Sequence, residues 1–224
     1  MKNSVKKEIE KLIKELDLNC SIEEFEDKVD WVGISYKQIL SENFIREFQD
    51  KVHWNWISWR QTLSENFIKE FQNKVDWDWI SYKQKLSEDF IKEFQNKVNW
   101  YKISEYQTLS ENFIREFHDK IDWFYISRYQ TLSENFIREF HDKIDWSLIS
   151  EWQILSEKFI RKFQGRVNWF CIFSDQKLSL DFILEFKDKI NWEYIRKSQK
   201  ITKQELKDRL EKTRVKNKFK LIRF

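Results

Sequence analysis

The stretch TLSENFIREFHDKIDW, residues 108–123, recurs letter for letter at residues 131–146, whereas most of the seven residues between the two copies differ from their counterparts in other copies. Tryptophans mark the same point of the pattern every 23 residues: Trp31, Trp54, Trp77, Trp100, Trp123, Trp146, Trp169 and Trp192. A fixed period of this length is typical of solenoids and arrays, in which each repeat buries its apolar face against its neighbours.

With each tryptophan as position 0, the repeat reads W-x-x-I-S-x-x-Q-x-L-S-E-x-F-I-x-E-F-x-D-K-V-D. Positions 0, 3, 4 and 7 lie on one side of a helix, whereas Leu at position 9 would point to the opposite side. The first helix is therefore expected to end by about position 8. Positions 13, 14, 17 and 21 form the apolar stripe of a second helix.

Helix-capping residues separate the two helices of each repeat. Ser at position 10 is a good N-cap, and Leu at 9 with Ile at 14 has the spacing of a hydrophobic staple. Asp or Asn at position 22 is placed to cap the next first helix. Glu at 11 with Arg or Lys at 15, and Glu at 16 with Lys at 20, are predicted to form i,i+4 ion pairs. The pattern predicts an all-α fold, an α-solenoid of about eight two-helix repeats.

The chain divides into three predicted parts. Residues 1–20 are expected to form an N-terminal capping helix, residues 21–198 the repeat array, and residues 199–224 a C-terminal capping helix followed by a basic tail. Phe25, Asp27, Lys28 and Val29 match the end of an earlier, imperfect repeat. The tryptophans Trp77, Trp100 and Trp123 are expected to be mostly buried between successive repeats.

The composition narrows the class of protein. Hydrophobic residues make up 41% and aromatics 17% of the 224 residues, which argues against disorder. No apolar run has the length of a membrane span, and the charged N-terminus does not resemble a signal peptide. The two isolated cysteines, Cys20 and Cys171, form no metal or redox motif, so a reducing, intracellular location is expected.

Charge is unevenly distributed. Residues 196–224 hold 12 Lys/Arg and 3 Asp/Glu, so the remainder holds 29 Lys/Arg and 35 Asp/Glu. The basic tail has two interpretations. It could be functional, as a contact with nucleic acid or a membrane surface or as a nuclear targeting segment, or it could be a solvated tail whose apolar residues close the last repeat. The candidate nucleic-acid contacts are Arg214, Lys216, Lys218, Lys220 and Arg223.

The wording of the repeat, as in ISYKQKLSEDFIKEFQNKVNW at residues 80–100, resembles the repeat proteins of mimivirus-like giant viruses that share the W-x-x-I-S-x-x-Q-x-L-S motif. The resemblance covers about residues 22–200. It implies a viral origin and a location in the host cytoplasm, with the nucleus as the alternative, and it assigns no catalytic residues.

Variation among the repeats is concentrated on the first helix. Exposed positions of the second helix change conservatively, whereas positions 2, 5 and 6 of the first helix change radically and often carry Trp or Tyr. This favours a surface for a protein or peptide partner from a host cell, although a tolerant, drifting surface is the alternative. The candidate partner-binding residues are Tyr36, Lys37, Trp56, Trp59, Arg60, Trp79, Tyr82, Lys83, Tyr106, Tyr125, Tyr129 and Trp152. In helical projection positions 2 and 5 lie opposite the core stripe, so Trp56, Trp59, Trp79 and Tyr82 are expected to be substantially exposed and to form one patch.

Other recurrent polar residues point to structure rather than chemistry. The Gln at position 7 is expected to satisfy carbonyls at the helix end, with a grip on an extended peptide as the alternative. The Ser at position 4 fits a close approach of helices, and no acid–base partner recurs near it. The Arg/Lys stripe at position 15 could follow phosphates, but its acidic neighbours favour a salt-bridge lattice. His53, His118 and His141 lack metal-ligand spacing. We therefore predict no catalytic, cofactor or metal site, and a protein that is not an enzyme.

Overall fold

The computed structural model describes residues 1–189, and the predicted C-terminal capping helix and basic tail lie outside the described residues. The chain divides into an N-terminal unit, residues 1–121, and a C-terminal unit, residues 122–224, and each is described by itself. In both units every repeat that the structure describes contains two short helices, which confirms the predicted α-solenoid.

The N-terminal unit contains four repeats behind two capping helices. The capping helices are α1 (Asn3–Glu15) and α2 (Phe25–Lys28). The first helices are α3 (Trp31–Lys37), α5 (Trp54–Arg60), α7 (Trp77–Lys83) and α9 (Trp100–Tyr106). The second helices are α4 (Glu42–Glu47), α6 (Glu65–Glu70), α8 (Glu88–Glu93) and α10 (Glu111–Glu116).

The C-terminal unit continues the same order through residue 189. Its first helices are α11 (Trp123–Tyr129), α13 (Trp146–Trp152) and α15 (Trp169–Asp175). Its second helices are α12 (Glu134–Glu139), α14 (Glu157–Lys162) and α16 (Leu180–Glu185), followed by a 3₁₀ turn at Lys187–Lys189.

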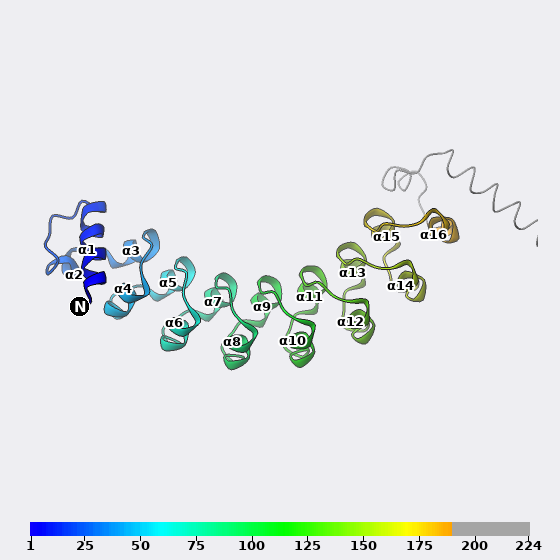
Figure 1. The fold of residues 1–224 in the computed structure, drawn as a ribbon, viewed down its shortest axis with the longest axis horizontal. Helices are drawn as coiled ribbons and strands as arrows, with labels where there is room; N and C mark the ends of the chain where they lie inside the picture. Colours follow the sequence, from blue (N-terminus) through cyan, green and yellow to red (C-terminus); the bar gives the residue numbers. More distant parts are fainter. Residues whose placement is uncertain (190–224) are drawn as a thin grey trace, which may run out of the picture. The chain divides into compact units, whose positions relative to one another are not determined.

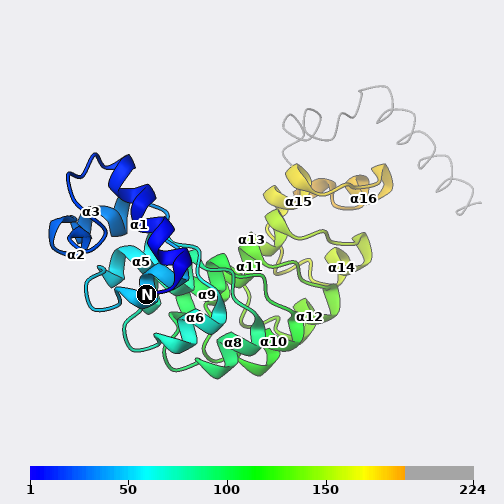
Figure 2. The same ribbon diagram turned by 60° about the vertical axis from the view of Figure 1, so that its left-hand side comes forward.

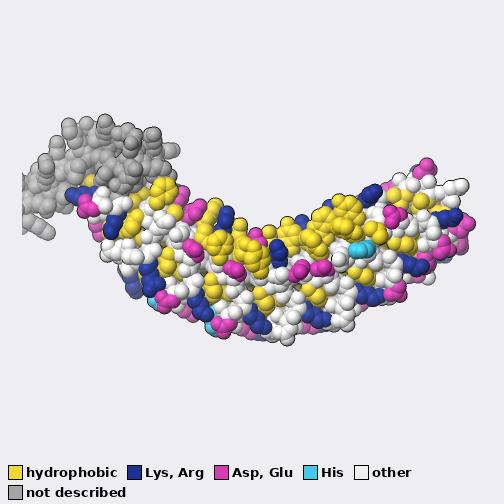
Figure 3. All heavy atoms as spheres, turned by 180° about the vertical axis from the view of Figure 1, so that it is seen from behind, with side chains coloured by type: hydrophobic (Ala, Val, Ile, Leu, Met, Phe, Trp, Pro, Cys, Tyr) yellow, Lys and Arg dark blue, Asp and Glu magenta, His cyan; other side chains and the backbone are white. Residues whose placement is uncertain are grey.

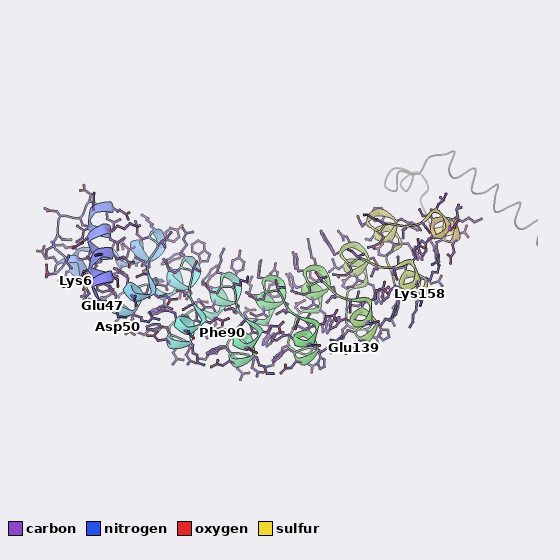
Figure 4. All side chains as sticks on the ribbon, viewed as in Figure 1. Lys6, Glu47, Asp50, Phe90, Glu139 and Lys158 are labelled. Carbon is purple, nitrogen blue, oxygen red and sulfur yellow. The ribbon has the colours of Figure 1, made fainter. Side chains whose placement is uncertain are left out.

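Within each unit the first helices form one row and the second helices another (Figures 1 and 2). Successive first helices pack directly against one another: α3 on α5, α5 on α7 and α7 on α9 in the N-terminal unit, and α11 on α13 and α13 on α15 in the C-terminal unit. Side chains at positions 3, 13 and 14 fill the space between the rows, as Phe90 does in Figure 4. In the described part of the chain, the side of the first-helix row that faces away from the second helices is not covered by another row of helices.

The capping helix α1 takes over the role of a preceding second helix. It packs on α4 and buries Val5, Ile9 and Leu12, as the apolar pattern predicts. The carboxylate of Glu8 accepts hydrogen bonds from the backbone N–H and the hydroxyl of Ser41, at 2.8 and 2.5 Å. Within the array the Glu at position 11 makes the equivalent bond to the next repeat, for example from Ser64 N–H to Glu42 at 2.7 Å.

The prediction that the position 0 tryptophans are mostly buried is wrong. Trp77, Trp100 and Trp123 are half-buried, and the described rings contact Phe side chains of their own repeat, with centroid distances of 6.2 and 5.0 Å from Trp77 to Phe90 and Phe94. The indole N–H of Trp77 reaches back to the carbonyl of Gln72 in the preceding repeat, at 2.9 Å. The ring therefore covers the edge of the core and stays partly in solvent.

The Gln at position 7 joins neighbouring repeats through buried hydrogen bonds. The Nε2 of Gln84 donates to the carbonyl oxygens of Gln61 at 2.8 Å and Ser58 at 3.4 Å, and its Oε1 accepts from Leu63 N–H at 3.0 Å. Gln61 and Gln107 repeat this arrangement in the N-terminal unit. The amide thus satisfies the carbonyls at the end of the preceding first helix, as the structural interpretation of the Gln ladder predicts.

The predicted caps are present, with one exception among the described repeats. Ser at position 10 accepts from the backbone N–H three residues later in every described second helix, as Ser64 does from Phe67. Asp or Asn at position 22 caps six of the seven first helices, and His53 makes no side-chain cap for α5. The Ser at position 4 has a specific role as well, because buried Ser58 accepts from Asp76 N–H and donates to Trp54 O.

We expect replacement of Gln84 by Leu to lower the free energy of unfolding by about 3 kcal/mol, because an unpaired buried N–H or carbonyl costs about 1–3 kcal/mol. Urea unfolding followed by circular dichroism measures the change. The matched control is Lys85→Ile, since the equivalent Ile39 and Ile154 are exposed and the control should change stability by less than about 0.5 kcal/mol. Equal stability of both variants would contradict the proposed role of the amide.

Candidate binding surface on the first helices

The two helix rows present different surfaces to solvent. Large hydrophobic residues that are exposed in the described part of the chain are confined, apart from Met1, to the first helices and the residue after their C-cap: Val32, Tyr36, Ile39, Tyr101, Tyr106, Phe124, Tyr129, Trp152, Ile154 and Phe170. These occupy positions 1, 5, 6 and 8 of the repeat. An apolar surface that is restricted to one face marks a candidate interaction site.

In the N-terminal unit the aromatic side chains of this surface touch one another across three repeat boundaries. The ring centroids of Tyr36 and Trp56 are 4.8 Å apart, and those of Trp56 and Trp59 are 5.5 Å apart. Trp59 continues to Trp79 at 5.7 Å. We call this series the aromatic strip, and its members are Tyr36, Trp56, Trp59, Trp79, Tyr82 and Tyr106.

The strip ends at the fourth first helix. Trp79 lies 6.0 Å from Tyr82 on the same helix, and Tyr82 lies 4.4 Å from Tyr106, edge to face. The predicted apolar patch is therefore present, and it alternates between position 5 of one repeat and position 2 of the next over the first three repeats. Figure 3 shows hydrophobic side chains gathered along this side of the N-terminal unit, with Lys and Arg among them.

The predicted exposure of the strip needs correction. Trp56, Trp59, Trp79 and Tyr82 are half-buried, whereas the side chains at positions 1 and 6 are the exposed ones in every described repeat. In a helical projection, positions 2 and 5 lie opposite the buried stripe of the helix. In the fold, side chains of a neighbouring first helix pack against them and cover part of their surface. Position 1 was missed as part of this surface, although its variation from Val32 and Asn55 to Tyr101 could have indicated it.

Cations lie over the aromatic rings of the strip. The guanidinium carbon of Arg60 is 5.5 Å from the ring centroid of Tyr36 and 5.3 Å from that of Trp59, and Arg60 Nε donates to the Tyr36 carbonyl at 3.2 Å. The Lys83 ammonium is 4.4 Å from the Tyr82 centroid, and Lys102 lies 5.4 Å from the same ring. Distances below about 6 Å are attractive cation–π contacts. Lys37, which follows Tyr36 in the sequence, is exposed.

The C-terminal unit carries a smaller aromatic group on its first helices. Tyr125 and Tyr129 are stacked with centroids 6.1 Å apart, and Arg128 lies over Tyr129 and Trp152 at 5.2 and 5.6 Å. Tyr129 and Trp152 are exposed, whereas Tyr125 is half-buried. The three candidate residues predicted in this unit therefore share one surface.

The pKa of the thiol at Cys171 is raised, chiefly because burial disfavours the thiolate and further because Glu151 and Asp175 are nearby. A thiol of this kind stays protonated at neutral pH and is a poor nucleophile. Cys20 is also a free cysteine. Within residues 1–189, His, Cys, Asp and Glu form no cluster that could hold a metal ion.

The second-helix surface consists of ion pairs and hydrogen bonds between repeats. Arg46 contacts Glu42 of its own helix at 3.5 Å and Glu70 of the next repeat at 2.7 Å. Lys69 pairs in the same way with Glu93 of the next repeat, and Lys74 pairs with Asp50 at 2.7 Å. Glu47 and Asp50 lie on this side in Figure 4. The lattice expected for the position 15 cations is therefore confirmed.

The predicted pairing of Glu at 16 with Lys at 20 is wrong for Glu70 and Lys74, which pair with other residues. The second helix is shorter than its apolar stripe suggests and ends at position 16, so position 20 lies in the turn that follows. The carboxylate of Glu70 at position 16 instead contacts Arg46 of the preceding repeat. Charged side chains in this layer thus join repeats as well as stabilising single helices.

Comparison of the chain with protein-family models, with curated proteins and with solved structures finds no match. The resemblance to giant-virus repeat proteins therefore stays a prediction. No helix among the described residues combines the length and apolarity that crossing a membrane requires.

The carboxylate of Glu157 should make unfolding pH-dependent. Burial acts to raise its pKa, but hydrogen bonds from Ser179 and the charge and hydrogen bond of Arg161 outweigh that effect, so the pKa is lowered. A lowered folded-state pKa stabilises the fold above the unfolded-state value of about 4.3, and this contribution is lost as the pH falls through the folded-state pKa.

We expect Glu157→Gln to unfold more easily than the unmodified chain at pH 7, by about 1–2 kcal/mol, because a charged acceptor is lost. The difference should shrink as the pH falls below about 4.3 and through the folded-state pKa, because the carboxylate of the unmodified chain then becomes protonated in both states. Urea unfolding at several pH values measures it. A difference that is constant from pH 7 to pH 3 would show that ionisation of Glu157 contributes nothing.

Proposed function

We propose that the protein is a non-enzymatic repeat scaffold that binds a protein or peptide partner through the surface of its first helices. The observation that carries the proposal is the confinement of exposed large hydrophobic residues to that surface, Met1 apart, within the described chain. Random drift would place such residues on both helix rows, because the repeats are copies of one sequence. Trp, Tyr and Arg are also the residues found most often as binding hot spots.

The contrast with the second-helix surface supports the same proposal. There, Arg46, Lys69 and Lys74 are held by carboxylates of neighbouring repeats. The aromatic strip, by comparison, has rings that pack on one another at the level of the surface and remain partly in water. Contacts with a partner would remove this remaining area from water, at about 25 cal/mol per Å² of apolar surface.

The resemblance of the repeat to giant-virus proteins supports an origin in such a virus and a location in the host cytoplasm. The partner would then be a host protein. Both statements rest on the repeat motif alone.

We expect the double variant Trp59→Ser, Trp79→Ser to lose the partner while it keeps its helicity. Because both rings are half-buried, each change should cost about 1–2 kcal/mol of stability, not the full cost of a core tryptophan. The measurement is affinity capture from a nuclease-treated lysate of the cells that produce the protein, with quantitative mass spectrometry and circular dichroism on the same samples.

The matched control is Lys69→Ser, Lys92→Ser, which makes two changes on the second-helix surface, where both lysines are paired with glutamates. The control should retain every protein that the unmodified chain retains. Loss of partner from both variants alike, or from neither, would refute a binding surface on the first helices. Loss of helicity in the tryptophan variant alone would assign the two rings to the core.

A second candidate function rests on charge. Residues 196–224 carry 12 Lys/Arg against 3 Asp/Glu, which favours a nucleic-acid contact through Arg214, Lys216, Lys218, Lys220 and Arg223. If this tail binds nucleic acid, deletion of residues 214–224 should abolish retention on immobilised DNA or RNA at low salt without a change in helicity. Retention that is unchanged by the deletion would reject the tail as the contact.

A further inference from the structure

The cations beside the aromatic strip differ from four cations of the second-helix surface in the same unit. Lys37, Arg60, Lys83 and Lys102 form no ion pair with any carboxylate in residues 1–189. The cations Arg46, Lys69, Lys74 and Lys92 of the second-helix surface do form such pairs, in the same unit. Positive charge that no carboxylate in the described residues neutralises therefore lies beside the aromatic strip.

Carboxylates near the strip are few, and three of them take part in hydrogen bonds within the fold. Positions 0–8 of the four repeats in the N-terminal unit hold five Lys/Arg and two Asp/Glu, Asp78 and Glu105. Asp78 accepts from the side-chain amide of Asn99 at 2.7 Å. The capping carboxylates of Asp30 and Asp76 accept from the N–H groups of their own helices. A partner for this surface is therefore expected to carry negative charge.

A cation recurs at position 6 in the first three repeats. Lys37, Arg60 and Lys83 all occupy position 6, are exposed, and lie on first helices that pack directly against one another. Packed helices are about 8–10 Å apart. A polyproline II chain advances about 3.1 Å per residue with three residues per turn, so every third side chain lies on the same side, about 9.3 Å from the last. In a β-strand, successive side chains point to opposite faces, so carboxylates at every third residue would point alternately toward and away from the cations.

We infer that the aromatic strip binds an acidic segment in polyproline II conformation, with a carboxylate at every third residue facing Lys37, Arg60 and Lys83 in turn. This rests on the proposed function and assigns the chemistry of the partner. Aromatic-lined surfaces are the usual receptors of polyproline II segments. The rings of Trp56, Trp59 and Trp79 would contact the residues between the carboxylates.

Single-stranded nucleic acid is the alternative negatively charged partner for a surface of aromatic and cationic side chains. It binds such surfaces by stacking its bases on free faces of the aromatic rings. In the strip, faces of two rings are already in use. Tyr36 and Trp59 are stacked on each other with an interplanar angle of 13°, and the guanidinium of Arg60 lies over both. The strip therefore offers contact area and charge, and a peptide fits this better than a series of bases.

The test is fluorescence anisotropy of the full chain with labelled synthetic peptides. A peptide of four Glu-Pro-Pro triplets should bind, and the matching Gln-Pro-Pro peptide should bind at least about tenfold more weakly, equivalent to about 1.4 kcal/mol. A peptide of the same composition with its four glutamates adjacent should also be weaker. Equal binding of the Glu and Gln peptides would overturn the assignment of an acidic partner, and equal binding of the rearranged peptide would overturn the three-residue spacing.

The variant Arg60→Gln, Lys83→Gln should weaken the Glu-Pro-Pro peptide about tenfold or more, whereas Lys69→Gln, Lys92→Gln on the second-helix surface should not. Circular dichroism of each variant checks that the fold is retained. Absence of binding up to about 1 mM peptide, equal effects of the two variants, or tighter binding of a labelled oligothymidylate that competes for the same residues would each overturn the inference. Partner capture that still depends on Trp59 and Trp79 would leave the proposed function standing in all three cases.

Discussion

The structure depends on the Gln side-chain amide at position 7, which supplies hydrogen-bond partners to the carbonyls at the end of the preceding first helix. The described helices of the repeats are six or seven residues long, far below the length at which an isolated helix is stable in water. The chain has two glycines and no proline, so the usual residues that end a helix are nearly absent. The Gln at position 7 supplies the hydrogen bonds instead, to the carbonyls and the N–H of the preceding repeat.

This arrangement makes each repeat dependent on its neighbour. Gln84 completes the helix end formed by Ser58 and Gln61, and Ser58 accepts from the N–H of Asp76, which caps the following first helix. Glu42 bonds the N–H of Ser64, which caps the next second helix. These helix ends are thus also bonded by residues 18 to 26 positions away in the sequence. Variation at these positions would leave buried polar groups unpaired, which costs more than most surface changes.

The same division explains why the first-helix surface can vary. The hydrogen bonds described above that join helix ends come from side chains at positions 4, 7 and 11, whereas the side chains at positions 1, 2, 5 and 6 lie at or near the surface. A repeat can therefore carry Trp56 and Trp59 or Lys102 and Glu105 at positions 2 and 5 without loss of the scaffold. The variability of the first-helix surface and the constancy of the repeat both follow from one hydrogen-bond pattern.

By itself the sequence determined the two-helix repeat, because the period, the Ser and Asp/Asn caps and the apolar stripes are local features of a helix and its ends. It also indicated which row of helices varies. Only the tertiary structure decided the burial of Trp56, Trp59 and Trp79, the partial exposure of Trp77, and the partner of Glu70. A helical projection shows which residues of one helix share a face. It does not show which residues of a neighbouring repeat pack against that face, and in this fold the neighbouring repeat decides burial and ion pairing.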